Sequence, residues 1–122
     1  MTDIRAARKW FRIESDSLYT YDKGYCDYAW FREIDDKGAF FVTRLRRNAR
    51  LKVIGQHLTP NGKPGVMADD IVELELQNTS EAYPGKLRRV KFHDAETNRD
   101  YVFLTNNFRL FAATIATIYK RR

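Results

Sequence analysis

The side chain in this sequence that most suggests chemistry is Asp22, in the segment Tyr21-Asp22-Lys23-Gly24. A carboxylate at the carboxyl end of a parallel strand lies where α/β proteins collect metal and ligand groups, which makes Asp22 a candidate metal ligand. An aspartate before Lys-Gly is also a common turn former. Because divalent cations in phosphoryl-transfer sites are held by several carboxylate oxygens, a metal role for Asp22 requires further carboxylates.

The other acidic side chains near Asp22 are more typical of a solvated helix face than of a catalytic group. They lie on or at the end of a predicted helix and comprise Asp27, Glu33, Asp35 and Asp36, of which Asp35 and Asp36 are two and a half or more helical turns from Asp22. Other chemistry is not indicated. A single cysteine excludes an intrachain disulfide, its spacing from the two histidines fits no familiar zinc site, and no hydrolase or nucleotide-binding motif occurs.

Basic residues are concentrated in one stretch without acids. The window from Lys37 to Ala68 contains no Asp or Glu. The stretch is either an edge that contacts phosphates or an exposed linker kept soluble by its charge, and both interpretations stay open. Its central basic residues, our candidate DNA contacts, are Arg44, Arg46, Arg47, Arg50 and Lys52.

Length and composition limit the class of protein. The 122 residues are enough for one domain, and 43% hydrophobic and 14% aromatic residues are typical of a globular chain. The 22 Lys and Arg exceed the 16 Asp and Glu by six, and a pI near 9.6 favours an anionic partner such as nucleic acid. We expect no membrane span, no signal peptide and no small-molecule substrate, and a location in the bacterial cytoplasm.

The elements that must position these residues begin with a strand–helix–strand unit. An amphipathic helix is predicted over residues 3–13, then a strand over 18–22, a helix over 25–36 and a strand over 39–43. This order predicts a βαβ unit with parallel strands. The residues expected to face inward from the second helix are Cys26, Ala29, Trp30 and Ile34.

The central part of the chain has strand periodicity and turn residues. Strand-like segments occur at residues 51–54, 71–76, 87–92 and 100–104, which predicts a four-strand antiparallel meander that interrupts the α/β frame. A final helix is predicted over 108–119 behind an Asn106 or Asn107 cap. The aromatic residues at strand spacing are expected to be core rather than base-stacking platforms. These are Tyr19, Tyr21, Phe40, Phe41 and Phe92.

Four stretches together resemble a known family. Residues Ser17–Phe31, Gly38–Arg44, Leu104–Asn106 and Ile118–Arg122 are similar, in this order, to the bacterial insertion-sequence DDE transposases of the IS-four family. The resemblance implies an α/β fold, a partial ribonuclease-H-like core interrupted by an antiparallel β-rich insertion. We therefore expect residues 1–45 and 106–122 to be core and residues 46–105 to be the insertion.

The resemblance also implies a chemistry and its residues. In that family three carboxylates bind two Mg²⁺ or Mn²⁺ ions, which activate water or a DNA 3′-hydroxyl for attack on a phosphodiester. Asp22 resembles the second carboxylate and is the expected catalytic and metal residue. Tyr119 and Arg122 resemble the start of a tyrosine-arginine-glutamate signature and are expected DNA contacts. The first aspartate would lie before Met1 and the glutamate beyond Arg122, so we expect this chain alone neither to hold the ions tightly nor to cut DNA.

Three hypotheses about function follow. According to the first, the chain is part of a transposase that binds transposon-end DNA. The second is a separate DNA-binding or regulatory module without catalysis, and the third is a basic protein-interaction domain. Apolar surface on Phe40, Phe41 and the final helix would favour a homodimer.

Overall fold

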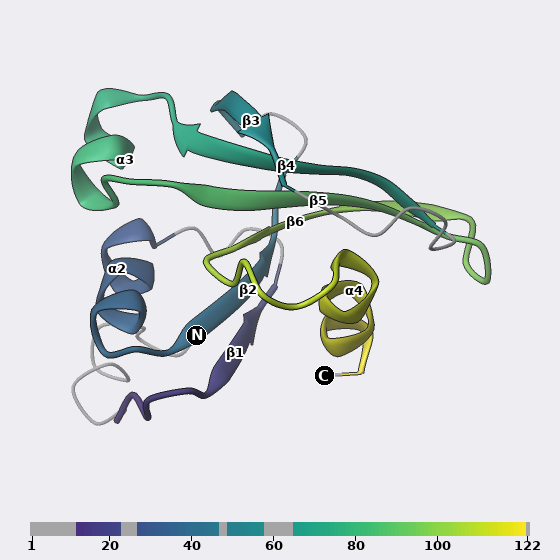
Figure 1. The fold of residues 1–122 in the computed structure, drawn as a ribbon, viewed down its shortest axis with the longest axis horizontal. Helices are drawn as coiled ribbons and strands as arrows, with labels where there is room; N and C mark the ends of the chain where they lie inside the picture. The colour runs from purple at the N-terminus through teal and green to yellow at the C-terminus, as the bar shows by residue number, and fades with distance from the viewer. Residues whose placement is uncertain (1–11, 23–26, 47–48, 58–64, 122) are drawn as a thin grey trace, which may run out of the picture.

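A computed structural model describes residues 12–22, 27–46, 49–57 and 65–121. The helix predicted over residues 3–13 lies mainly outside the described residues, as do Cys26, Arg47 and Arg122. Among the described residues no helix is long and apolar enough to cross a membrane. The fold is mixed α/β, as expected, with one six-stranded sheet and helices on both of its faces (Figure 1).

The predicted βαβ unit is confirmed. Strand β1 (Leu18–Tyr21), helix α2 (Tyr28–Asp36) and strand β2 (Phe40–Arg44) follow one another, and β1 pairs with β2 in parallel from Leu18 opposite Phe40 to Tyr21 opposite Thr43. The Asp27 carboxylate accepts a hydrogen bond of 3.0 Å from the Trp30 amide and caps α2. Ala29 is exposed, contrary to our prediction, because the buried stripe of α2 consists of Trp30, Phe31 and Ile34.

The predicted meander is also present, but it extends the same sheet. Strands β3 (Leu51–Gln56), β4 (Val66–Leu74), β5 (Leu87–Asp94) and β6 (Arg99–Thr105) pair antiparallel in succession, and β6 then pairs with β2. The strand order is therefore β1-β2-β6-β5-β4-β3. This architecture is consistent with a partial ribonuclease-H-like fold, and the division at residues 45 and 106 stays a prediction.

Two helical details differ from the sequence predictions. Helix α3 (Gln77–Ala82) was not expected, and it buries none of its residues. Helix α4 (Ala112–Lys120) begins four residues later than predicted. The reason is Asn107, whose side-chain oxygen accepts 2.9 Å hydrogen bonds from the amides of Arg109 and Leu110 and so forms a turn before the helix.

The two faces of the sheet have separate cores. On one face Phe31 of α2 stacks on Phe41 of β2 with ring centroids 4.2 Å apart. On the other face α4 packs Ile115 and Tyr119 against strand residues that include Phe103 (Figure 1). Phe41 and Ile115 are fully buried, whereas Phe40 is partly buried and Phe111, at the start of α4, is 52% exposed, so the structure shows only part of the apolar surface that we expected. A homodimer stays a prediction.

Candidate nucleic-acid and metal site

Asp22 lies directly after β1, at the carboxyl end of the parallel pair, and is exposed. Since Tyr21 pairs with Thr43, the register places Asp22 beside Arg44, the last residue of β2. Side chains alternate between the faces of a sheet. Asp22 therefore lies on the same face of the sheet as Leu18, which packs against the core that α4 covers.

One carboxylate has the chemistry of a ligand for Mg²⁺ or Mn²⁺ but does not make a two-ion site. Among the residues that the structure describes, no group of three His, Cys, Asp or Glu side chains comes together. Three acids of the second predicted helix, Asp27, Asp35 and Asp36, instead have structural partners. Asp36 pairs with Arg32 at 2.9 Å, and Asp35 accepts a 2.9 Å hydrogen bond from the Asn106 amide. The described residues thus do not surround Asp22 with the three carboxylates that the resemblance implies.

The candidate DNA contacts do not share one surface. Arg44 holds its guanidinium 4.8 Å from the centre of the Tyr101 ring, a cation–π contact. Arg46 is exposed just after β2, and Lys52 is exposed on β3 at the opposite edge of the sheet. Arg50 is exposed and lies 3.4 Å from the Glu75 carboxylate.

Tyr119 has a different environment from the other candidates. It is 5% exposed in the core beneath the sheet, with its ring centre 4.8 Å from that of Phe103. The next residue, Lys120, lies 2.9 Å from the Asp94 carboxylate of β5, and this hydrogen bond lowers the pKa of Asp94. The ion pair therefore fixes the end of α4, and with it Tyr119, against the β5–β6 hairpin.

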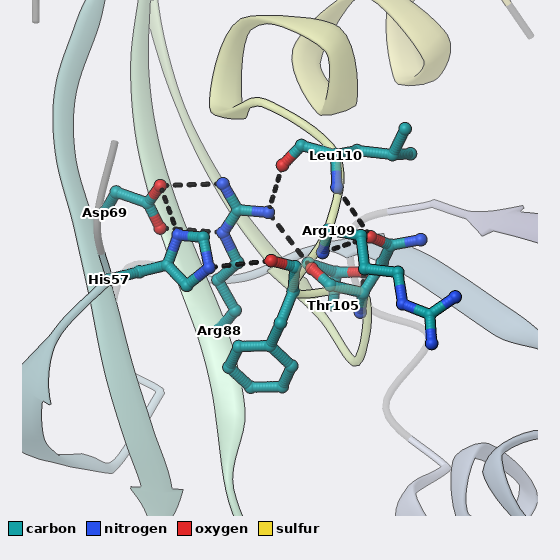
Figure 2. A network of polar contacts seen from close by, with 8 residues as sticks. His57, Asp69, Arg88, Thr105, Arg109 and Leu110 are labelled. Atoms are coloured by element: carbon teal, nitrogen blue, oxygen red, sulfur yellow. Dashed lines mark hydrogen bonds and ion pairs between the residues drawn. The ribbon is translucent and has the colours of Figure 1, made fainter. Parts of the chain in front are cut away.

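The start of α4 is held by a buried polar network around Arg88 (Figure 2). The fully buried Arg88 guanidinium donates from Nε and Nη2 to the two Asp69 oxygens at 2.8 and 2.7 Å. Its Nη1 donates to the carbonyls of Asn107 and Leu110 at 3.1 and 2.6 Å. The network ties β4 and β5 to the loop that leads into α4.

His57 also belongs to this network. One ring nitrogen lies 3.3 Å from Asp69 and the other lies 2.7 Å from the Phe108 carbonyl (Figure 2). Each ring nitrogen thus faces an acceptor on a different element. His57 is therefore a structural residue of this network in the described fold.

A cavity of about 450 Å³ opens beside Arg44 and Arg46. Two further cations, Arg89 and Lys91 of β5, line it. Sequence reasoning assigned these two residues only to a strand. The signal available was the alternation in residues 87–92, which places Arg89 and Lys91 on one face and the lone Arg88 with the apolar residues of the other.

Comparison with known proteins assigns the family. Residues 2–122 match the family described as "Transposase DDE domain". The chain belongs to this family. Members are transposases, which act on DNA and depend on divalent metal ions. The match supports the expected fold class and the general function.

A curated relative agrees with this assignment. The chain is 38% identical over 114 residues to the "Putative transposase y4zB" of Sinorhizobium fredii. The alignment covers 90% of this chain and 31% of the relative, so the chain spans about a third of that protein's length. No solved structure matches the chain significantly.

Proposed function

We propose that this chain supplies one metal-binding carboxylate, Asp22, and part of the DNA-binding surface of a transposase of the IS-four family. The observation that carries the proposal is the position of Asp22 at the carboxyl end of the parallel pair β1–β2, beside Arg44. In such a site a carboxylate holds a divalent ion, and a neighbouring guanidinium neutralises a DNA phosphate.

The divalent ion, when bound, would activate the attacking oxygen and stabilise the leaving oxygen. Among the described residues Asp22 is the ligand that this chain offers, and further carboxylates would have to join it. We therefore propose that the 122-residue chain binds Mn²⁺ weakly at Asp22, binds DNA, and does not cleave it alone.

The metal part is tested by adding Mn²⁺ to the ¹⁵N-labelled chain and recording which amide signals broaden. We expect broadening around Asp22 that is lost in Asp22→Asn and kept in Glu33→Gln, an exposed α2 carboxylate. Equal broadening in wild type and Asp22→Asn would refute the assignment of the metal to Asp22. It would then favour a non-catalytic DNA-binding module.

The cleavage part is tested with supercoiled plasmid and either Mg²⁺ or Mn²⁺. We expect no nicking above the level of Asp22→Asn. Metal-dependent nicking by the wild-type chain that Asp22→Asn abolishes would show that this chain holds a complete site, contrary to the proposal of a single ligand.

A further inference from the structure

The cavity beside β2 forms where the sheet loses a strand. Strand β2 ends at Arg44, opposite Phe103, and the amide of Leu45 still bonds β6, at the Val102 carbonyl (2.7 Å). The first part of β6, from Arg99, pairs with β5 on one side and has no paired residue of β2 on the other. The cavity lies at this step and extends along the sheet, because Leu51 of β3 and Met67 of β4 line it together with groups from the end of β2, from β6 and from β5.

Four cations converge on the cavity: Arg44 and Arg46 from the end of β2, and Arg89 and Lys91 from β5. The acidic residue of its lining is Asp100, whose carboxylate lies 2.6 Å from His93. Like charges that share a cavity repel one another, and an entering anion relieves this repulsion. The lining therefore favours an anionic ligand.

These cations keep unused hydrogen-bonding capacity. None of the ion pairs found among the described residues involves Arg44, Arg46 or Lys91. Arg89 donates from Nη2 to Asp70 at 2.8 Å, but its buried Nε has no hydrogen-bond partner in the described part of the chain. A guanidinium with N–H groups to spare suits a multi-oxygen anion such as a phosphate.

The position of the cavity points to a particular anion. Arg44 lines the cavity and lies beside Asp22 in the register of β1 and β2. Its guanidinium is oriented by the Tyr101 ring, which also lines the cavity. Alternation places Asp22 and Arg44 on the face of Leu18 and Tyr101, beneath α4, and Arg89 and Lys91 on the other face with Leu87. A polymer of phosphates that passes Asp22 therefore reaches the cavity at Arg44, around the end of β2.

We propose that this cavity binds the phosphodiester backbone of the DNA strand that runs past Asp22, with Arg89 and Lys91 as contacts in addition to Arg44 and Arg46. The proposal rests on the proposed DNA-binding function and adds the path of the strand. The face of β5 that carries Arg89 and Lys91 would thus bind DNA phosphates, a role separate from the binding of a metal ion by Asp22.

The test is the salt dependence of DNA affinity, measured by fluorescence anisotropy with a short labelled duplex as the KCl concentration is raised. The cavity variant is Arg46→Gln with Lys91→Gln, because neither side chain has an ion-pair partner among the described residues. The matched control is Lys37→Gln with Lys86→Gln, two exposed lysines that do not line the cavity. Circular dichroism establishes that both variants are folded.

The cavity variant should reduce the slope of log K against log salt by about 1.8, from roughly 0.9 for each phosphate that the variant no longer neutralises, while the control keeps the wild-type slope. An unchanged slope in the cavity variant of a chain that binds DNA would overturn the cavity proposal alone. A wild-type chain that does not bind DNA at low salt would overturn both proposals. Binding of polyglutamate that competes with DNA and is lost in the cavity variant would identify an acidic polypeptide as the ligand instead.

Discussion

Arg88 and Arg89 are neighbours on β5 but serve opposite faces of the sheet. Arg88 is fully buried, and three of its nitrogens are bonded to a carboxylate and two carbonyls. Arg89 lines an open cavity with three other cations and keeps an unpartnered Nε among the described residues. The same residue type thus stabilises the fold on one face and offers charge to a ligand on the other. What differs is that the protein supplies acceptors for three nitrogens of Arg88, whereas for Arg89 the described residues supply Asp70 as an acceptor for Nη2 and leave Nε without one.

The largest effect on stability should come from Arg88→Met. Removing one partner of a buried ion pair leaves the Asp69 charge uncompensated, so the free energy of unfolding should fall by about 3–5 kcal/mol in urea titrations. Adding Asp69→Leu should recover much of this loss, because an apolar pair can replace a buried ion pair. A loss of about 1 kcal/mol or less, typical of an exposed pair, would contradict the structural role of Arg88.

The turn that Arg88 holds should be the next most sensitive position. Asn107→Ala removes the acceptor of two amide hydrogen bonds in a buried turn, and we expect a loss of about 1–3 kcal/mol in the free energy of unfolding. The control is Asn78→Ala, an exposed α3 residue that should change stability by about 0.5 kcal/mol at most. Equal losses in both variants would show that the Asn107 turn does not support α4.

A smaller effect should depend on pH. Lys120 lowers the pKa of Asp94 in the folded state, so the stabilisation by this pair is present above the unfolded aspartate pKa of about 3.9 and is lost as the pH falls further. Lys120→Met should therefore lose less stability than wild type between neutral pH and about pH 3. The control is Lys37→Met, at an exposed position. The same acid-induced loss in wild type and Lys120→Met would rule out this coupling.

The smallest effect on stability should come from the cavity itself. Lys91→Gln should change the free energy of unfolding by about 0.5 kcal/mol at most, because Lys91 has no ion pair among the described residues. Its DNA affinity should nevertheless fall. Thermal melting that shows a loss of several degrees would place Lys91 with Arg88 as a structural residue and remove the contrast between the two faces.

Much of the fold could be predicted from the sequence because burial leaves a local pattern. The continuous apolar run before Arg44 predicts β2, and the alternation in residues 87–92 predicts β5. Helix α3 could not be predicted in this way, since it buries no side chain and has no apolar periodicity. The start of α4 was predicted too early because apolar spacing continues through a turn that Asn107 imposes.

The candidate site could be predicted only in part. Asp22 and Arg44 were found because each lies at the end of a strand with a recognisable pattern. Their closeness depends on the β1–β2 register, and the convergence of Arg89 and Lys91 with Arg46 depends on the pairing of β2 with β6. Such pairings join residues far apart in the chain and leave no local signal.

The most direct test of DNA binding at the cavity is an NMR titration of the ¹⁵N-labelled chain with a short DNA duplex. We expect shifts in the amide signals of residues 44–46, 89–91 and 100–102, while the signals of Asp69 and of residues 107–110 stay in place. Shifts confined to the second group, or absent from the first group while DNA is bound, would contradict the assignment of ligand binding to the cavity face.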